Sequence, residues 1–303
     1  MTLDSDVQRW LLEGDPAIRW QVMDDLLDRP QSSVQRERSK VATAGWGKAL
    51  LDVQDPEGTW AHGIYSRKWV STTYTLLLLW RMGLPPTNDA ARRGCAVLWD
   101  SVIVDGGVLL KTQTVPPDIC ISAFWLLLAA YYGHEDDRIP AVLEWVLDHQ
   151  LDDGGWNCAT IRTGSSHSSF HTTIQVLEAL QVMDANAEAA ARGREFLLEH
   201  RLYRSHRTGE VANKAFTMLS FPPRWHYDIL RALDYFRAVN APVDTRLEDA
   251  LDLLRSKRRK DGRWPVQNKH GGLVWFDMET GRQPSRWNTL RALRVLRGAE
   301  DSA

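Results

Sequence analysis

Apolar residues dominate six segments of this 303-residue sequence, which span residues 17–27, 70–82, 119–132, 171–183, 226–239 and 286–296. Segments with one apolar and one polar face lie between them, at residues 34–53, 90–99, 138–149, 188–200 and 245–255. Their apolar positions follow the helical period, and runs that alternate in polarity as strands do are absent from the sequence. The pattern predicts an all-α protein built from pairs of helices.

A glycine-centred turn recurs along the chain and separates these pairs. It reads DPEGTW, VDGGVL, LDDGGW, RTGEV and KDGRW, and the central residues are Gly58, Gly106, Gly154, Gly209 and Gly262. The spacings are 48, 48, 55 and 53 residues, and a weaker copy, LEGDP, surrounds Gly14. Regular spacing of this kind indicates a repeat architecture in which each repeat is one helical hairpin.

The polarity of the apolar helices predicts how the hairpins are arranged. In an open solenoid the helices of the concave side face water and carry a polar stripe. Here the stretches TTYTLLLLW and SAFWLLLAAYY are apolar on nearly every side, which is typical of helices that are buried all round. We therefore expect six hairpins to close into an α/α toroid with a central cavity. Because no low-complexity linker interrupts the repeats, residues 1–303 are expected to form a single domain.

The longest connections, residues 59–69, 157–170 and 263–285, are expected to be non-helical, and all lie between a glycine turn and an apolar helix. Since they share this topological position, they should gather at one rim of the ring, where the inner helices begin. Long loops that cluster on one face usually form the functional face of a repeat protein.

Composition and charge exclude several classes of function. The formal net charge is -2, and acids and bases alternate without a basic stripe, so we expect no nucleic acid partner. The longest apolar run, 123–132, is about half of the ~20 residues that cross a bilayer, so no membrane span is expected. Three cysteines form no even disulfide framework, and MTLDSDVQRW does not resemble a secretory leader, which favours a cytoplasmic location. The 14 tryptophans either line the cavity or fill the core.

Asp118 and Cys120 stand where the third apolar segment begins, in VPPDICISAFW. The two prolines favour an extended entry, which leaves Asp118 at the helix cap and Cys120 in the first turn. His171 opens the next apolar segment, 51 residues after Cys120. Because neighbouring inner helices begin side by side, we expect the three residues to meet at one point of the rim. Oxygen, sulfur and nitrogen donors, three in number, are typical of a catalytic zinc with an open fourth position.

Structural roles are the alternative for each of these residues. Asp118 can serve only as a helix cap, and Cys120 only as a small buried side chain. Cys158, in GGWNC, is more typical of a packed loop thiol, although its place at the rim leaves contact with the site open.

The repeats resemble those of two related families of α/α toroids. The turns EGTW, GGW and DGRW are similar to the glycine and tryptophan repeats of squalene cyclases, over nearly the whole chain. The stretch GGVLLKTQTVPPDICISAFW resembles the zinc-binding repeat of protein prenyltransferase β-subunits, in which an Asp-x-Cys pair opens one inner helix and a histidine opens the next. This resemblance implies an α/α toroid and gives Asp118, Cys120 and His171 the role of zinc ligands.

The sequence also departs from the prenyltransferases. They hold a diphosphate with basic residues before the Asp-x-Cys pair and with a tyrosine after it, where this sequence has Thr112, Val115 and Ile121, and only Lys111 remains nearby. Other cations precede or begin inner helices, namely Arg67, Lys68, Arg162, Arg224, Lys269 and Arg286. The prenyltransferases also work with a separate α-subunit, and nothing in this sequence points to such an obligate partner.

Acidic motifs of the cyclases are absent or misplaced. The Asp-x-Asp-Asp string with which squalene-type cyclases protonate their substrate does not occur. The string DDLLD at residues 24–28 matches a magnesium-binding pattern of another terpene synthase class. It lies toward the C-terminal end of its helix, so we expect it at the opposite rim of the ring from the zinc candidate. We interpret it as a solvated helix end.

Two further residues, His226 and Asp228, begin the fifth inner helix in PPRWHYDIL. They are candidates for a catalytic acid and base in the cavity, and helix capping with bonds to loops is the alternative. The residues expected to line the cavity or contact the substrate are Trp69, Trp225, Tyr227, Trp287, Lys68 and Arg224. Core packing is the alternative for the tryptophans.

Three functions follow from these observations. The first is a Zn²⁺ enzyme, prenyltransferase-like or cyclase-like, that acts on an apolar small-molecule substrate, of which an isoprenoid is one example. The second is a metal-free cyclase or glycan-processing enzyme with Asp118 or Asp228 as general acid. The third is a binding or scaffold protein without catalysis. Metal analysis separates the first from the others.

Overall fold

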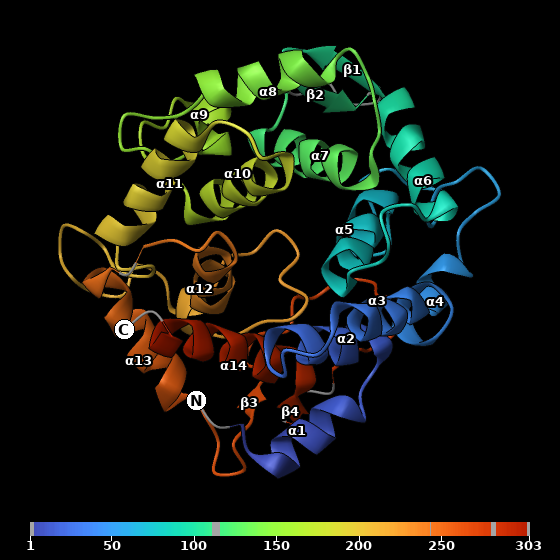
Figure 1. Ribbon diagram of the computed structural model, residues 1–303. Helices are drawn as coiled ribbons and strands as arrows, with labels where there is room; N and C mark the ends of the chain where they lie inside the picture. Colours follow the sequence, from blue (N-terminus) through green and yellow to red (C-terminus); the bar gives the residue numbers. More distant parts are fainter. Residues whose placement is uncertain (1–2, 111–115, 243, 280–282, 302–303) are drawn as a thin grey trace. The chain divides into compact units, whose positions relative to one another are not determined.

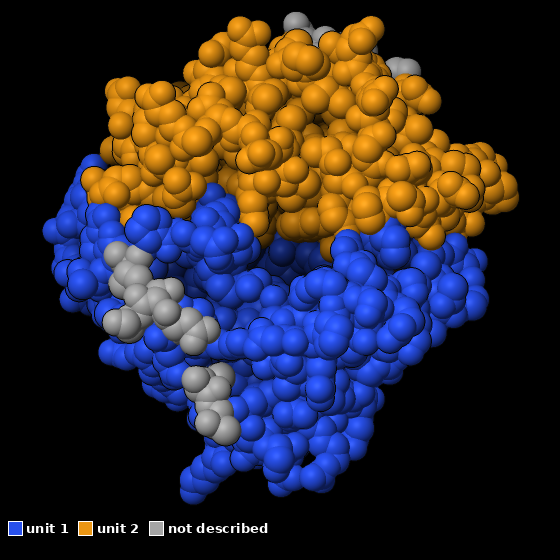
Figure 2. All heavy atoms as spheres, in the orientation of Figure 1, with its two compact units in different colours: residues 1–52, 81–85, 200–303 blue, residues 53–80, 86–199 orange. Residues whose placement is uncertain are grey.

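The computed structural model describes residues 3–110, 116–242, 244–279 and 283–301 (Figure 1). These residues are predominantly helical, which confirms the all-α class. The chain divides into two compact units (Figure 2). Unit 1 contains residues 1–52, 81–85 and 200–303, and unit 2 contains residues 53–80 and 86–199. The expected single domain stays a prediction.

Unit 2 contains the third and fourth repeats and most of the second. Its elements are α5 (Thr72–Met82, of which the last two residues belong to unit 1), α6 (Asp89–Asp100), β1 (Val102–Asp105), β2 (Gly107–Leu110), α7 (Ile119–Tyr132), α8 (Ile139–Asp148), α9 (Cys158–Thr163), α10 (Phe170–Met183) and α11 (Ala187–Glu199).

The apolar helices α7 and α10 lie side by side, α8 packs on α7, and α11 packs on α10 (Figure 1). Nearly all of α7 and most of α10 are buried, as their sequences predict. Two side chains of α7 reach α5, because Trp125 Nε1 donates to Thr73 Oγ1 at 3.2 Å and the Tyr132 hydroxyl donates to the Leu76 carbonyl at 3.3 Å. Unit 2 therefore has an inner layer of apolar helices covered by amphipathic ones.

Unit 1 contains both ends of the described chain. Its elements are α1 (Ser5–Leu12), α2 (Pro16–Asp25), α3 (Gln31–Ser39), η1 (Lys40–Ala42), α4 (Gly45–Leu51), η2 (Lys214–Thr217), α12 (Ile229–Ala238), η3 (Thr245–Leu247), α13 (Glu248–Ser256), β3 (Trp264–Pro265), β4 (Pro284–Ser285) and α14 (Arg286–Asp301). The first and last apolar helices, α2 and α14, pack against each other, and α12 packs on α14.

A buried ion network joins these three helices of unit 1. Asp234 of α12 accepts hydrogen bonds from Arg294, at 2.6 Å to Nε, and from Arg291, at 3.3 Å to Nε. Arg294 also reaches Asp25 of α2 at 2.9 Å, and Arg237 donates to the same carboxylate at 3.2 Å. Burial acts to raise the pKa of Asp234, but the guanidinium of Arg294, with those of Arg291 and Arg237, outweighs it and holds this pKa far below its usual value.

The recurring glycine turns have a common geometry. All five central glycines have positive φ, between 72° and 90°, a conformation that residues with a Cβ rarely adopt. In four repeats the residue two positions after the glycine donates its backbone N–H to a hydroxyl of the following helix, at 3.0 Å each. The pairs are Trp60 with Thr72, Val108 with Ser122, Trp156 with Thr173, and Trp264 with Thr289. The three tryptophans of these turns are fully buried, which supports their role in the core.

Two features differ from the sequence prediction. The segment at residues 34–53 is interrupted, because Ala44 is extended, with φ -150° and ψ 161°, and Gly45 has φ +63°, so a right-handed helix does not continue through them. Short antiparallel strands also occur, since β1 pairs with β2 around the Gly106 turn and β3 pairs with β4. These ribbons are too short to show alternating polarity in the sequence.

No described helix combines the length and the apolar character that a membrane crossing requires. Closure of all six hairpins into a ring stays a prediction.

Candidate metal centre

The candidate site lies in unit 2, where α7 begins. Asp118 occupies the N-cap position of α7 with an extended backbone, φ -104° and ψ 126°, as the preceding prolines predict. Its side chain makes no capping hydrogen bond to α7. The carboxylate is therefore available for contacts outside its own helix, and Cys120 follows in the first turn.

A short helix in the next long connection completes this site. The connection at residues 157–170 is expected to be non-helical, but α9 forms there and carries Cys158 and Arg162. Asn157 caps α9 by accepting a hydrogen bond from the Ala159 N–H, and Gly164, in the left-handed conformation, ends it. An asparagine and a glycine seven residues apart are start and stop signals that could have revealed this helix.

Asp118, Cys120 and Cys158 form one cluster of possible metal ligands. One donor atom of each, a carboxylate oxygen and two sulfurs, lies within 4.8 Å of the other two. The backbone N–H of Cys120 donates to Cys158 Sγ at 3.3 Å, and Thr172 Oγ1 donates to the same sulfur at 3.6 Å. Cys158 thus connects the beginnings of α7, α9 and α10.

Arg162 holds one side of the Asp118 carboxylate. Its guanidinium donates to Asp118 Oδ2, while Oδ1 is buried and has no hydrogen-bond partner in the described part of the chain. Burial raises the pKa of Asp118, and the positive charge of Arg162 opposes this effect. A buried carboxylate oxygen without a partner is costly, and in native proteins it often marks the place of a ligand or ion.

The two thiols differ in acidity. The hydrogen bond from the Cys120 side chain lowers the pKa of Cys158 more than burial raises it, and the Cys120 N–H and the Thr172 hydroxyl add to the effect. The same hydrogen bond, together with burial, raises the pKa of Cys120. Cys158 is consequently the sulfur on which negative charge is stabilised.

These residues fit a zinc ion. Zinc accepts thiolate and carboxylate ligands, and in a tetrahedral site two of them lie about 3.5 Å apart. The cluster supplies two sulfurs and one oxygen within 4.8 Å, and Asp118 Oδ1 is a buried acceptor that has no hydrogen-bond partner among the described residues. Arg162 on the other carboxylate oxygen resembles the outer partners that orient metal ligands in known sites.

His171, the third ligand predicted from the sequence, lies in the first turn of α10. It is half-buried and precedes Thr172, whose hydroxyl contacts Cys158 Sγ. The cluster found among the described residues contains Cys158 and does not include His171. The ligand role of His171 stays a prediction.

Aromatic residues lie near the cluster in unit 2. The hydroxyls of Tyr65 and Tyr74 are 2.9 Å apart, and the Tyr74 ring contacts Trp69 and Phe124, at centroid distances of 4.8 and 6.3 Å. Burial raises the pKa of Tyr65, and the nearby Cys120 and Asp118 add to this shift, so its hydroxyl keeps its proton. Lys68 Nζ lies 5.4 Å from the centre of the Tyr65 ring, within cation–π range.

The predicted acid and base, His226 and Asp228, belong to unit 1. Asp228 is buried, caps α12 by accepting from the Arg231 N–H, and accepts two hydrogen bonds from Ser220. The His226 ring is stacked on Trp225 at 3.8 Å and on His270 at 3.7 Å. The bonds of Asp228 match the capping alternative.

The other residues predicted to line the cavity have mixed environments. Trp69 and Trp287 are 5% and 2% exposed, and Trp287 stacks on Phe221 at 4.2 Å, so both have the packing of core residues. Tyr227 is buried, and its hydroxyl donates to the Leu202 carbonyl at 2.6 Å. Trp225 and Arg224 are half-buried, and Arg224 has φ +56°.

The remaining predicted cations have local partners or lie elsewhere. Lys269 pairs with Asp277 at 2.5 Å, and Arg286 lies over the Trp10 ring at 4.7 Å. Lys111, Thr112 and Val115 lie outside the described residues.

The DDLLD string lies at the end of α2, and its acids differ in exposure, since the side chain of Asp28 is 71% exposed as predicted whereas that of Asp25 is not. Asp25 is mostly buried and paired with Arg294 and Arg237, and Asp28 pairs with Arg297 at 2.6 Å. Asp24 accepts a hydrogen bond from Gln31 at 2.7 Å. These bonds engage the carboxylates of the string inside unit 1.

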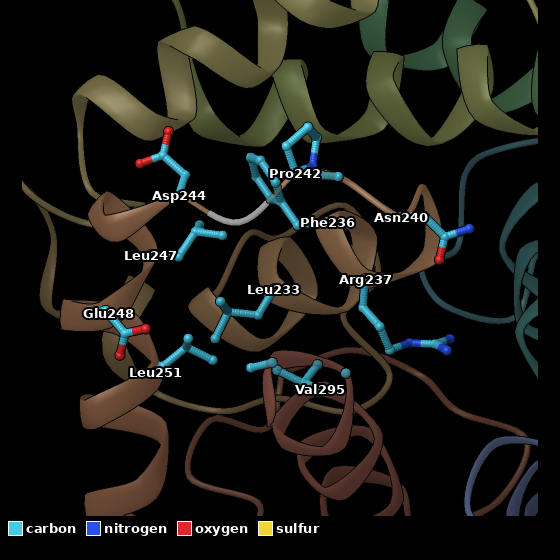
Figure 3. A pocket seen from close by; sticks show the side chains of 13 residues that line it. Leu233, Phe236, Arg237, Asn240, Pro242, Asp244, Leu247, Glu248, Leu251 and Val295 are labelled. Atoms are coloured by element: carbon cyan, nitrogen blue, oxygen red, sulfur yellow. The ribbon is translucent and has the colours of Figure 1, made fainter. Parts of the chain in front are cut away.

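A separate hollow of about 200 Å³ lies in unit 1. Figure 3 shows Leu233 of α12, Leu251 of α13 and Val295 of α14 around it. The acids on its rim have partners, since Asp244 binds Arg246 at 2.7 Å and Glu248 lies 3.5 Å from Arg255. The described lining therefore combines apolar side chains with the polar Arg237 and Asn240.

Comparison with known proteins places few constraints on this chain. No family model matches it, and no curated protein does either. A solved structure of a protein from Actinoplanes is 17% identical, covers 95% of this chain and 90% of that chain, and has a TM-score of 0.49. Type II terpene cyclase MstE from Scytonema is 14% identical and covers 96% of this chain and 90% of that chain, with a TM-score of 0.48. A variant of that cyclase in complex with geranylgeranyl dihydroxybenzoate is 15% identical. The match covers 95% of this chain and 87% of that chain, with a TM-score of 0.48. Likenesses at this level carry no inference about the activity of this chain.

Proposed function

We propose that this protein is a zinc enzyme in which Asp118, Cys120 and Cys158 hold the ion and an apolar small molecule reacts beside it. The observation that supports the proposal is the cluster itself, in which two sulfurs and a carboxylate oxygen lie within 4.8 Å and Asp118 Oδ1 is buried with no partner in the part of the chain that the structure describes. The residues come from two repeats, at positions that the sequence resemblance assigns to a zinc site for Asp118 and Cys120.

Bound zinc would supply a Lewis acid that activates a thiol, hydroxyl or water nucleophile. The residues of the chain prepare the site in other ways. Arg162 fixes one oxygen of Asp118, and the Cys120 N–H and the Thr172 hydroxyl fix Cys158 Sγ. The Tyr65 hydroxyl accepts a hydrogen bond from Tyr74 and keeps its own proton on the aromatic side of the site.

Aromatic neighbours support an apolar substrate. Tyr65, Trp69, Tyr74 and Phe124 form a continuous set of ring contacts close to the cluster. Aromatic faces bind apolar groups and stabilise cationic character in a reacting molecule. An isoprenoid is the substrate class that the sequence resemblance implies.

Elemental analysis of protein purified without added metal tests the proposal. We expect about one zinc per chain in the natural protein, as for a single mononuclear site, and only trace zinc in Cys120→Ala and Cys158→Ala. Cys95→Ala is the matched control, because Cys95 is a fully buried cysteine of α6 that takes no part in the cluster. Trace zinc in the natural protein would contradict the proposal and favour a metal-free enzyme or a binding protein.

The same measurement on His171→Gln decides between two ligand sets. Zinc retained in this variant favours Cys158 as the third ligand. Zinc lost from His171→Gln and retained in Cys158→Ala favours the set predicted from the sequence.

A further inference from the structure

We propose that Cys120 and Cys158 form a reversible disulfide when the protein meets hydrogen peroxide. The two sulfurs belong to one cluster within 4.8 Å, and Cys158 Sγ accepts the backbone N–H of Cys120 at 3.3 Å. A disulfide requires the sulfurs to approach to about 2 Å, and both cysteines lie in the first turns of their helices, α7 and α9. The residues are 38 positions apart in the sequence, so folding alone brings them together.

The exposure of the three cysteines favours this pair over any other. Cys120 and Cys158 are half-buried, whereas Cys95 is 0% exposed and burial raises its pKa to about 12. By this measure the pair is more accessible to peroxide than Cys95 is. The natural protein thus contains its own unreactive reference thiol.

Hydrogen-bond donors determine the order of the two steps. Two donors, the Cys120 N–H and the Thr172 hydroxyl, point to Cys158 Sγ and hold it in place, and this geometry assigns the attack on peroxide to Cys158. Cys158 attacks one oxygen of hydrogen peroxide, and the O–O bond breaks. The products are a sulfenic acid on Cys158 and a hydroxide, which takes up a proton to form water. Cys120 then attacks the Cys158 sulfur, the S–O bond breaks, and a second water leaves with the Cys120 proton. Peroxide is reduced to two waters, and the two thiols are oxidised to one disulfide.

The consequence for the metal rests on the proposed function, whereas the disulfide does not. A disulfide sulfur is no longer a thiolate ligand, so oxidation removes two of the three proposed donors at once. Zinc release should accompany oxidation, and reduction by a dithiol should restore both thiols and zinc binding.

The experiment treats the full chain with hydrogen peroxide in two forms, as isolated and after removal of metal by a chelator. Remaining thiols are alkylated, and peptide mapping by mass spectrometry identifies linked cysteines. We expect a Cys120–Cys158 link in the metal-free protein, loss of alkylation at both residues, unchanged alkylation of Cys95, and full reversal by dithiothreitol. In zinc-loaded protein, a chromogenic chelator should detect the release of zinc in step with the loss of thiols.

Two variants test the order of the steps. Cys120→Ser should stop at a Cys158 sulfenic acid, trapped by dimedone, while Cys158→Ser should show no trapping at Cys120 above the level of Cys95. Absence of the link in the metal-free natural protein, or a link that includes Cys95, would overturn the proposal whatever the variants do. A link in a protein that never contains zinc would leave the disulfide standing and refute the zinc function.

Discussion

Single residues show that the burial of an ion pair determines how much it contributes to the stability of the fold. Asp234 is buried among three guanidiniums, whereas Asp252 is 71% exposed and pairs with Arg255 within one helix turn. Exposed pairs contribute little because water screens them, and a buried charge that loses its partner is costly. The buried network of unit 1 should therefore dominate the electrostatic part of its stability.

Asp234→Asn should lower the free energy of unfolding by about 3 kcal/mol at neutral pH, because Arg291 and Arg294 would lose their common partner. Asp252→Asn, the control, should change it by less than about 0.5 kcal/mol. Urea denaturation followed by circular dichroism measures both values. Equal effects of the two substitutions would contradict this interpretation.

The pH dependence of the Asp234 effect has a definite sign. Its pKa is lower in the folded protein than the value of about 3.9 in an unfolded chain. The carboxylate therefore stabilises the fold fully above about pH 5, and this contribution decreases as the pH falls below about 4. Repeating the denaturation at about pH 3 should reduce the difference in the free energy of unfolding between the natural protein and Asp234→Asn. If this difference in free energy does not change with pH, the substitution destabilises the protein through altered packing and not through the lost charge.

The residues of the candidate site were predictable to different degrees. Asp118 and Cys120 follow two prolines at the start of an apolar run, so local sequence places them on one helix end. Cys158 joins them through a contact across 38 residues, which no helical period reveals. The contact of Arg162 was not predictable for the same reason, since its partner Asp118 is 44 residues away in the sequence.

At the scale of elements, the turn–helix hydrogen bond recurs in four repeats. In the fourth repeat, Trp156 N–H donates to Thr173 Oγ1, and this hydroxyl donates back to the Trp156 carbonyl at 3.3 Å. Both groups are buried, so neither can turn to water. The third repeat uses Ser122 for the same bond, which shows that the hydroxyl is the part that matters.

Thr173→Val should reduce the free energy of unfolding by about 1–3 kcal/mol, because it leaves the buried Trp156 N–H without an acceptor. Thr173→Ser keeps the hydroxyl and should restore most of this loss. Thermal denaturation monitored by near-ultraviolet circular dichroism, which reports on the buried tryptophan, measures the difference. If serine were as destabilising as valine, the lost methyl group and not the hydrogen bond would be the cause.

Long helices were predictable and short elements were not. The apolar run at 119–132 coincides with α7 because fourteen residues contain several helical turns. The six residues of α9 contain too few turns to show a period, and its only signals are the capping Asn157 and Gly164. The break in the segment 34–53 comes where Asp15, 31 residues earlier in the chain, accepts a hydrogen bond from the Trp46 N–H, a contact that helical periodicity does not reveal.

At the scale of the whole molecule, a metal that binds only the folded state stabilises the entire chain. If free zinc exceeds its dissociation constant about 100-fold, the gain is about 2.7 kcal/mol. Removing zinc with a chelator should therefore lower the melting temperature of the natural protein. Differential scanning fluorimetry measures this shift.

Cys158→Ala is the control for this measurement, because its melting temperature should not respond to the chelator. Cys95→Ala should respond as the natural protein does. A natural protein that contains zinc but melts at the same temperature with and without chelator would show that the ion is bound equally well by the unfolded chain.

The position of α9 in the chain has a consequence for the evolution of the site. It belongs to a connection, where insertions and deletions are tolerated best, and to neither helix of a hairpin. A deletion of a few residues there would remove one sulfur and leave every long helix in place. Two descendants of one ancestor could differ in their need for metal while their scaffolds remained the same.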